Sequence, residues 1–162
     1  MIRVTELLKK YGYIDESKYT PGSAEIGSKI HTQTELIENE MIYIDDPKAI
    51  QWAKFLKDYN AKVVEVEIRL DNGLVTGKID RILQIGDELV IVDIKTSKNK
   101  QDWWGIQLWA YFDLATFNGY KINKIWNVRL TKKKYIVDDW TLDINSRYLW
   151  QDIIKKEFGR LL

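Results

Sequence analysis

The sequence of 162 residues predicts an α/β fold, in which a single domain forms a mixed β-sheet flanked by helices. Three observations lead to this prediction. Three strand-like segments follow one another through tight turns, as in an antiparallel meander. A helical segment then leads to two further strand-like segments. Helical segments also precede and follow the strands, so they can cover the faces of a sheet.

A helical part is expected over about residues 1–60, and the sheet with its other helices over about residues 61–162. Residues 5–11 are expected to form a short helix. Residues 12–22 contain two glycines and a proline and are expected to form a loop. The helix predicted over residues 23–40 has apolar residues at helical spacing: Ile26, Ile30, Ile37 and Met41.

The next helix is predicted to begin at Asp46 and Pro47, because aspartate is a favoured N-cap and proline fits the first turn. It is expected to run to about Tyr59. The strands of the meander follow at residues 62–70, 74–83 and 88–95. Asp71-Asn72-Gly73, between the first two strands, is a strong signal for a hairpin turn.

The C-terminal part is predicted to hold two helices with two strands between them. They cover residues 101–118, 121–130, 135–140 and a last helix from Asp143 to about Phe158. Four of the seven tryptophans fit amphipathic patterns, so we expect them in the core: Trp52, Trp109, Trp126 and Trp150.

Composition narrows the functional classes. The net charge is +1, so any nucleic-acid partner must be held by a local patch rather than by a global basic field. The chain has no cysteine, which excludes disulfides, thiolate zinc sites and cysteine-ligated iron–sulfur clusters, and is consistent with an intracellular location. No segment approaches the ~20 apolar residues of a membrane helix, so no membrane partner is expected.

Two acids and a lysine are the most informative residues. Asp93 and Lys95 lie two apart on one predicted strand and therefore point to the same face, and Asp80 lies on the neighbouring strand. Charges converging on a sheet face are costly unless they bind a cation or form a tight pair. Carboxylate oxygens suit Mg²⁺ or Mn²⁺. The structural alternative is a simple salt bridge between Asp80 and Lys95.

From about His31 to Tyr111 the chain resembles the PD-(D/E)XK nuclease superfamily, in particular its RecB-like exonuclease branch. Ile79 stands where the superfamily name has proline. The resemblance is carried by four motifs in the order of that branch: Gly27-x-x-x-His31, Gly77-x-x-Asp80, Asp93-Ile94-Lys95-Thr96 and Gln107-x-x-x-Tyr111. It implies a restriction-endonuclease-like fold. Because the chain lacks cysteine, it looks most like the compact, cluster-free exonucleases of viral recombination systems and mitochondrial genome maintenance.

The resemblance also implies the metal ligands. Asp80 and Asp93 would bind Mg²⁺ or Mn²⁺, together with the backbone carbonyl of Ile94, and His31 would be a further ligand. Glu67 on the first strand is a possible additional acid, because relatives often carry one there. The alternative for Glu67 is an ordinary strand residue that faces solvent.

The remaining roles concern the reaction and the substrate. The resemblance implies that Lys95 orients or deprotonates the attacking water, and that Gln107 and Tyr111 hold a substrate phosphate or brace the lysine. Side chains just after the active strand are candidates for DNA contacts, with the lysines on phosphates and the indoles on bases: Lys98, Lys100, Trp103 and Trp104. Burial against the following helix is the alternative for both tryptophans.

These features predict a metal-dependent deoxyribonuclease that removes nucleotides from DNA ends, single-stranded or duplex. Two alternatives stay open. One is a nucleic-acid-binding or assembly protein that kept the fold without useful catalysis, and the other is a structure-specific endonuclease. The resemblance also leaves open a homo-oligomer or a recombination partner protein, and a host-cell location if the protein is viral.

Overall fold

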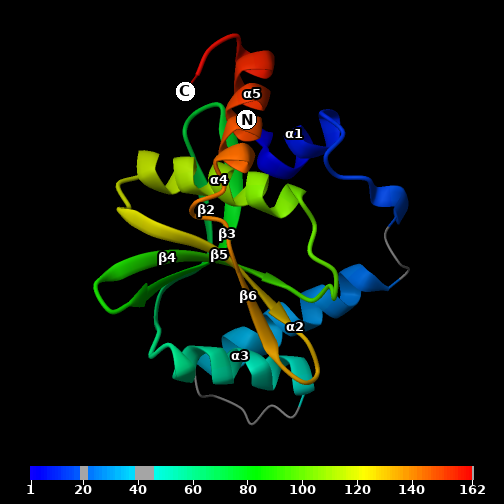
Figure 1. The fold of residues 1–162 in the computed structure, drawn as a ribbon, viewed down its shortest axis with the longest axis vertical. Helices are drawn as coiled ribbons and strands as arrows, with labels where there is room; N and C mark the ends of the chain where they lie inside the picture. Colours follow the sequence, from blue (N-terminus) through cyan, green and yellow to red (C-terminus); the bar gives the residue numbers. More distant parts are fainter. Residues whose placement is uncertain (19–21, 39–45, 162) are drawn as a thin grey trace.

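The computed structural model describes residues 1–18, 22–38 and 46–161, and it confirms the mixed sheet flanked by helices (Figure 1). The elements follow in chain order: β1 Ile2–Arg3, α1 Val4–Lys10, a 3-10 turn Glu16–Lys18, α2 Ser23–Glu38, α3 Pro47–Asp58, β2 Lys62–Asp71, β3 Val75–Ile85, β4 Glu88–Lys95, α4 Trp103–Phe117, β5 Ile122–Leu130, β6 Tyr135–Asp139 and α5 Ile144–Phe158.

Every predicted helix and strand is present, with ends that differ by at most two residues wherever both ends are described. Strand β1 and the 3-10 turn were not predicted. The end of the helix predicted over 23–40, the side chain of Ile37 and Met41 lie outside the described residues.

Local chemistry explains two of the boundaries. Helix α3 begins where the Asp46 carboxylate accepts hydrogen bonds from the backbone N–H groups of Lys48 (2.9 Å) and Ala49 (3.4 Å), as predicted for an N-cap. The β2–β3 hairpin turns at Gly73, whose φ of 90° is available to glycine at little cost. There the Asn72 side chain accepts from the N–H of Val75 at 2.9 Å.

The sheet has the order β1-β3-β4-β5-β6, and β2 pairs with β3 as well. Strands β4 and β5 are parallel and joined through α4, and β1 runs parallel to β3; the other pairs are antiparallel. The long strand β3 pairs with β4 only over residues 81–85. Strand β2 pairs with β3 over residues 76–84, and β1 pairs with residues 75 and 76. Residues 93–95 of β4 stay with β5. The sheet therefore divides between Asp80 and Asp93.

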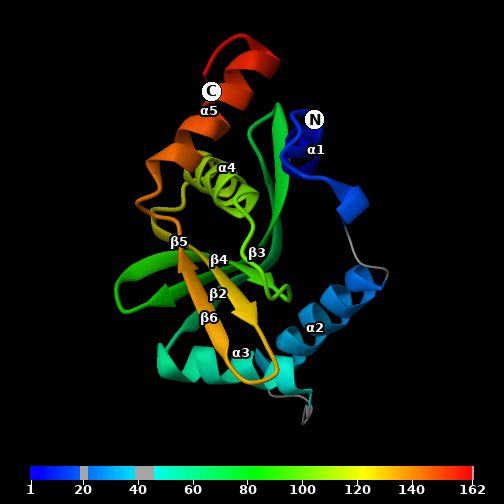
Figure 2. The ribbon, with the colours of Figure 1, turned by 45° about the vertical axis from the view of Figure 1, so that its right-hand side comes forward.

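Helices cover both faces of the sheet. Helices α1, α4 and α5 lie on one face and α2 and α3 on the other. The first part of β3, residues 75–80, extends beyond β4 and lies between α1 and α4 (Figure 2). Each face has its own apolar core. The four tryptophans predicted for the core are buried: Trp52, Trp109, Trp126 and Trp150.

Candidate active site

The division of the sheet places the two motif aspartates beside each other. Asp80 is the last residue of β3 before the pairing with β4 begins, and Asp93 is the first residue of β4 after that pairing ends. Both are buried, at 8% and 4% exposure. The backbone N–H of Ile94 donates to Asp80 Oδ2 at 2.8 Å, so the Asp80 side chain bridges the two arms of the sheet.

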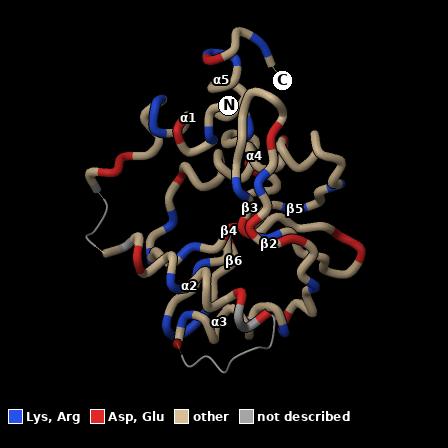
Figure 3. Tube along the Cα trace, turned by 180° about the vertical axis from the view of Figure 1, so that it is seen from behind, with Lys and Arg blue, Asp and Glu red and all other residues tan. Residues whose placement is uncertain are grey.

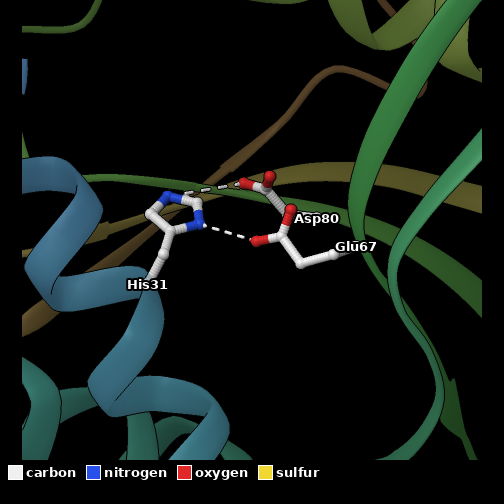
Figure 4. A group of neighbouring side chains, drawn as sticks. All are labelled: His31, Glu67 and Asp80. Carbon is white, nitrogen blue, oxygen red and sulfur yellow. Dashed lines mark hydrogen bonds and ion pairs between the residues drawn. The ribbon is translucent and has the colours of Figure 1, made fainter.

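His31 and two carboxylates form the best candidate for a metal site in the described part of the chain. From α2, His31 points its Nδ1 at Glu67 Oε1 (3.2 Å) and its Nε2 at Asp80 Oδ2 (3.8 Å) (Figure 4). One ligand atom from each of the three residues lies within 4.8 Å of the other two. Imidazole and carboxylate donors fit a divalent cation, and the imidazole favours Mn²⁺ over Mg²⁺.

Glu67 lies in this group, where the possible additional acid was expected, and the alternative of an ordinary strand residue facing solvent is not the arrangement found. Its side chain is only 22% exposed, whereas Val64 and Val66 on the same strand are about 40% exposed (41% and 40%). The cause is irregular backbone: the register of β2 shifts at Val64, and Glu67 itself has φ of 48°. A bulge changes the face toward which the following side chains point. Glu65 and Glu67 are therefore partly covered, and the valines of this strand are exposed.

Asp93 is paired with a lysine in this structure, and its role as a metal ligand stays a prediction. Its Oδ2 accepts from Lys95 Nζ at 2.7 Å and from the Asn127 side chain at 3.2 Å. Asp93 therefore lies beside the group of His31, Glu67 and Asp80 rather than within it. Lys95 pairs with Asp93 and not with Asp80, so the simple salt bridge between Asp80 and Lys95 is not the arrangement found.

Burial and charge shift the pKa values in a way that matches a cation site. Burial, and then the Asp93 charge, raise the pKa of Asp80 well above its ordinary value, although His31 and the Ile94 N–H act against them. Burial lowers the pKa of His31, but Glu67, Asp80 and Asp93 together outweigh burial and raise it. The His31 hydrogen bond is the largest cause that lowers the pKa of Glu67 to about 2. The repulsion between these carboxylates is relieved by a proton or by a cation.

Lys95 is held by a chain of side chains from α4. Its Nζ donates to Gln107 Oε1 at 3.1 Å, and Gln107 Nε2 donates to Tyr111 Oη at 3.0 Å. Tyr111 fits here because Gly77 has no side chain: a Cβ on Gly77 would stand 2.8 Å from Tyr111 Cε1. Of the two predicted roles for Gln107 and Tyr111, these contacts favour bracing of the lysine.

The candidate DNA contacts separate into two kinds. Trp104 is 2% exposed and packs in the core, so its prediction as a base-stacking side chain is wrong. Trp103 is half-buried, and Lys95 Nζ lies 4.8 Å from its ring centre. Lys98 and Lys100 are exposed on the loop after β4, with Lys100 Nζ 4.4 Å from the Trp140 ring centre.

A buried network next to Asp80 was not predicted. Arg81 is fully buried and donates from Nε to Glu38 Oε1 at 2.7 Å and from Nη2 to Thr34 Oγ1 at 3.0 Å. Trp52 Nε1 also donates to Glu38 Oε1, at 2.9 Å. The network ties α2 and α3 to β3 beside the acids. The sequence signal that could have pointed to it is Arg81 itself, a charged residue directly before the apolar pair Ile82-Leu83.

Asp80, Asp93 and Lys95 line a cleft of about 330 Å³ at the division of the sheet. The cleft is lined mainly by polar and charged residues: Arg3, Val4, Thr5, His31, Arg69, Thr76, Gly77, Lys78, Asp80, Asp93, Ile94, Lys95, Gln107 and Tyr111. Lys98, Lys100, Trp103 and Trp104 are not among its lining residues.

A mixed sheet that presents buried carboxylates and a lysine at a dividing edge is the arrangement of a metal-dependent nuclease. The chain belongs to the PD-(D/E)XK nuclease superfamily, whose family model matches residues 16–162. Members use divalent metals and act on nucleic acid. A comparison with curated protein sequences gave no match.

Two solved structures are similar over 96% of this chain. The crystal structure of SSO0001 has a TM-score of 0.49 and 20% identity, with 75% of that chain covered. A crystal structure from Eubacterium rectale, provisionally named an exonuclease, has a TM-score of 0.48 and 12% identity, with 74% of that chain covered. Among the described residues, no helix has the length and apolar character needed to cross a membrane.

Proposed function

We propose that this protein is a Mg²⁺- or Mn²⁺-dependent DNA exonuclease of the RecB-like, cluster-free kind. One observation carries the proposal: His31, Glu67 and Asp80 converge within 4.8 Å of one another, next to the pair of Asp93 and Lys95. The motif order along the chain and the absence of cysteine from the 162 residues support the branch.

The residues present fit a divalent cation. His31, Glu67 and Asp80 would hold it. Asp93 and Ile94 line the same cleft and would offer a carboxylate and a backbone carbonyl as further donors. A bound cation would supply positive charge for the phosphate oxygens and lower the pKa of water. A proton on Asp80 or His31 competes with the cation, so binding releases protons.

Lys95 is the group that we propose to act on the attacking water. Asp93 pairs with the ammonium group at 2.7 Å, and Gln107 at 3.1 Å fixes its direction. A fixed ammonium can orient the water by a hydrogen bond and stabilise the negative charge that develops on the phosphate in the transition state. Gln107 and Tyr111 are therefore positioning residues for Lys95.

Lys98, Lys100 and Trp103 are proposed to contact the DNA outside the cleft. The two lysines are exposed and follow directly after the active strand, where they can reach backbone phosphates. Trp103 is only half-buried and lies beside Lys95, which suits stacking on a base.

The exonuclease mode rests on the motif resemblance, and a structure-specific endonuclease is the second candidate. The deciding experiment is digestion of end-labelled linear DNA and closed circular DNA, single-stranded and duplex, with Mn²⁺, with Mg²⁺ and with excess chelator. An exonuclease degrades only the linear forms, whereas cutting of closed circles indicates an endonuclease. Cleavage that persists in chelator contradicts the metal site.

Site variants distinguish catalysis from binding on the same fold. We expect Asp80→Asn, Asp93→Asn and Lys95→Met each to lower the cleavage rate by about 100-fold or more, as is typical for loss of a group acting on a proton or on charge. The control is Asp87→Asn, which removes an exposed carboxylate from the turn before β4. If Asp93→Asn keeps a third or more of the activity, the catalytic assignment fails, and a binding protein is the better description.

A further inference from the structure

Two arginines in the cleft remain without a strong partner. Lys95 is paired with Asp93 at 2.7 Å, and Lys78 with Glu67 at 3.0 Å. Arg69 has no ion pair in the part of the chain that the structure describes. Arg3 reaches only Glu6, at 3.8 Å, and both of these side chains are more than half exposed, so the contact contributes little. The cleft therefore carries positive charge that its own acids do not neutralise.

The sheet register places both arginines on the same face of the sheet, on the two strands that flank residues 75–80 of β3. Arg3 on β1 lies opposite Thr76, and Arg69 on β2 lies opposite Lys78. Residues opposite each other on paired strands project to the same face, and so do Thr76 and Lys78, which are two apart. Asp80 follows two residues later, about 7 Å along the strand. Arg3, Arg69 and Lys78 thus lie on the same face as Asp80, next to the proposed metal ligands.

The surroundings agree with this placement. Both arginines line the same cleft as Asp80, Asp93 and Lys95. Burial and the aspartates raise the pKa of Tyr111, and the Arg69 charge acts on that hydroxyl in the opposite direction. Seen from behind, acidic segments gather where β2, β3 and β4 meet, and basic segments of β2 and β3 lie next to them (Figure 3).

We propose that Arg3 and Arg69 form a phosphate subsite for the substrate strand, beside the metal ligands and across the cleft from Lys95. The ligand is a phosphate group of the nucleic acid, either a diester within the strand or a monoester at its end. Guanidinium groups suit it because they present paired N–H donors to two phosphate oxygens. The identity of the ligand rests on the proposed nuclease function.

The test measures binding of a short single-stranded DNA oligonucleotide in EDTA. Fluorescence anisotropy gives the affinity at each of a series of salt concentrations. Arg3→Gln and Arg69→Gln should each weaken binding about tenfold and lower the slope of log affinity against log salt by about 0.7, the value for one phosphate contact on a single strand. The matched control is Lys62→Gln, an exposed cation at the far end of β2. Arg69→Lys should restore the salt slope but only part of the affinity, because it keeps the charge without the planar fork.

Oligonucleotides with a 5′-phosphate, with a 3′-phosphate or with hydroxyls at both ends distinguish the two ligands. A loss confined to one phosphorylated end identifies a terminal monoester, and an equal loss for all three identifies an internal diester. The subsite is overturned if both glutamine variants match Lys62→Gln in affinity and slope, or if the wild-type protein binds none of the oligonucleotides. Mn²⁺ binding by calorimetry should be unchanged in both variants. Because the binding test is done in EDTA, it does not depend on cleavage. A wild-type protein that does not cleave DNA would contradict the proposed nuclease function, while the binding test still decides on the phosphate subsite.

Discussion

At the scale of single residues, Lys95 determines how the site is organised. Asp93 and Gln107 fix its ammonium group, and the rings of Trp103 and Trp104 lie 4.8 and 5.4 Å from its Nζ. An ammonium against aromatic faces gains cation–π attraction and loses water on that side. The lysine is thus held in one direction before any substrate arrives, which is the property expected of a group that stabilises a transition state.

The two tryptophans should respond differently to truncation. Trp104→Ala should lower the free energy of unfolding by about 3–5 kcal/mol, because a fully buried indole is lost from the core. Trp103→Ala should cost less stability and should weaken single-stranded DNA binding about tenfold, as expected when one stacked base is lost. Denaturant unfolding and DNA affinity, measured on both variants, check this. A well-folded Trp103→Ala with unchanged affinity would leave the indole without a DNA role.

Glu67 should make stability depend on pH in acid. Its pKa is lowered to about 2 from an ordinary value of 4.5, so the folded protein favours the charged form. The stabilisation is fully present above the unfolded-state pKa and is lost as the pH falls from about 4.5 toward about 2. In chelator, Glu67→Gln should therefore melt below the wild type at pH 7, and the gap should close over that interval. A gap that stays constant down to pH 2 contradicts the charge interaction with His31.

At the scale of elements, the Arg81 network joins the helix that carries His31 to the strand that carries Asp80. Arg81→Met should lower the free energy of unfolding by about 3–5 kcal/mol, because it leaves the Glu38 carboxylate buried without its cation. Chemical denaturation measures the loss. Arg160→Met, at an exposed position near the end of the chain, is the control and should stay within about 0.5 kcal/mol of the wild type. Equal stability of the two variants would show that the network does not hold α2 in place.

The elements themselves were predictable because their signals are local. The Asp71-Asn72-Gly73 turn, the Asp46 cap and the strand alternation around Asp93 all act within a few residues, and each element is found where it was expected. Strand alternation could not give the direction of the Glu67 side chain, since the register of β2 shifts between Val63 and Glu65. Strand β1 was missed for a similar reason: its two residues show no periodicity, and only pairing with a distant strand makes them a strand.

The candidate site was predictable in composition but not in geometry. The motifs identified His31, Asp80, Asp93 and Lys95, and all four line one cleft. The grouping of Glu67 with His31, the pairing of Lys95 with Asp93 and the burial of Trp104 depend on how the sheet divides and how α4 packs. These are contacts between residues far apart in the sequence, and local sequence patterns do not predict them.

At the scale of the whole molecule, metal binding should stabilise the fold, because the candidate ligands come from a helix and two strands that unfolding separates. Mn²⁺ at 100 times its dissociation constant should add about 2.7 kcal/mol, which corresponds to about 5–11 °C in Tm for a chain of this size. Thermal melts with Mn²⁺ and with chelator measure the shift, independently of any cleavage. Asp80→Asn should abolish it, and an equal shift in that variant would place the cation elsewhere.

The division of the sheet makes the distance between the two aspartates depend on the geometry of the strands. Asp80 and Asp93 stand on separate arms, which diverge from the last shared pair, Arg81 and Val92. The Ile94 N–H donates a hydrogen bond to Asp80 across the gap. The distance between the two carboxylates therefore depends on the angle between the two strands beyond this last pair. A substitution that alters the twist at this pivot would retune the fit for an ion without touching any ligand. Substitutions near Arg81 and Val92 should therefore change the affinity for a cation even though they remove no proposed ligand.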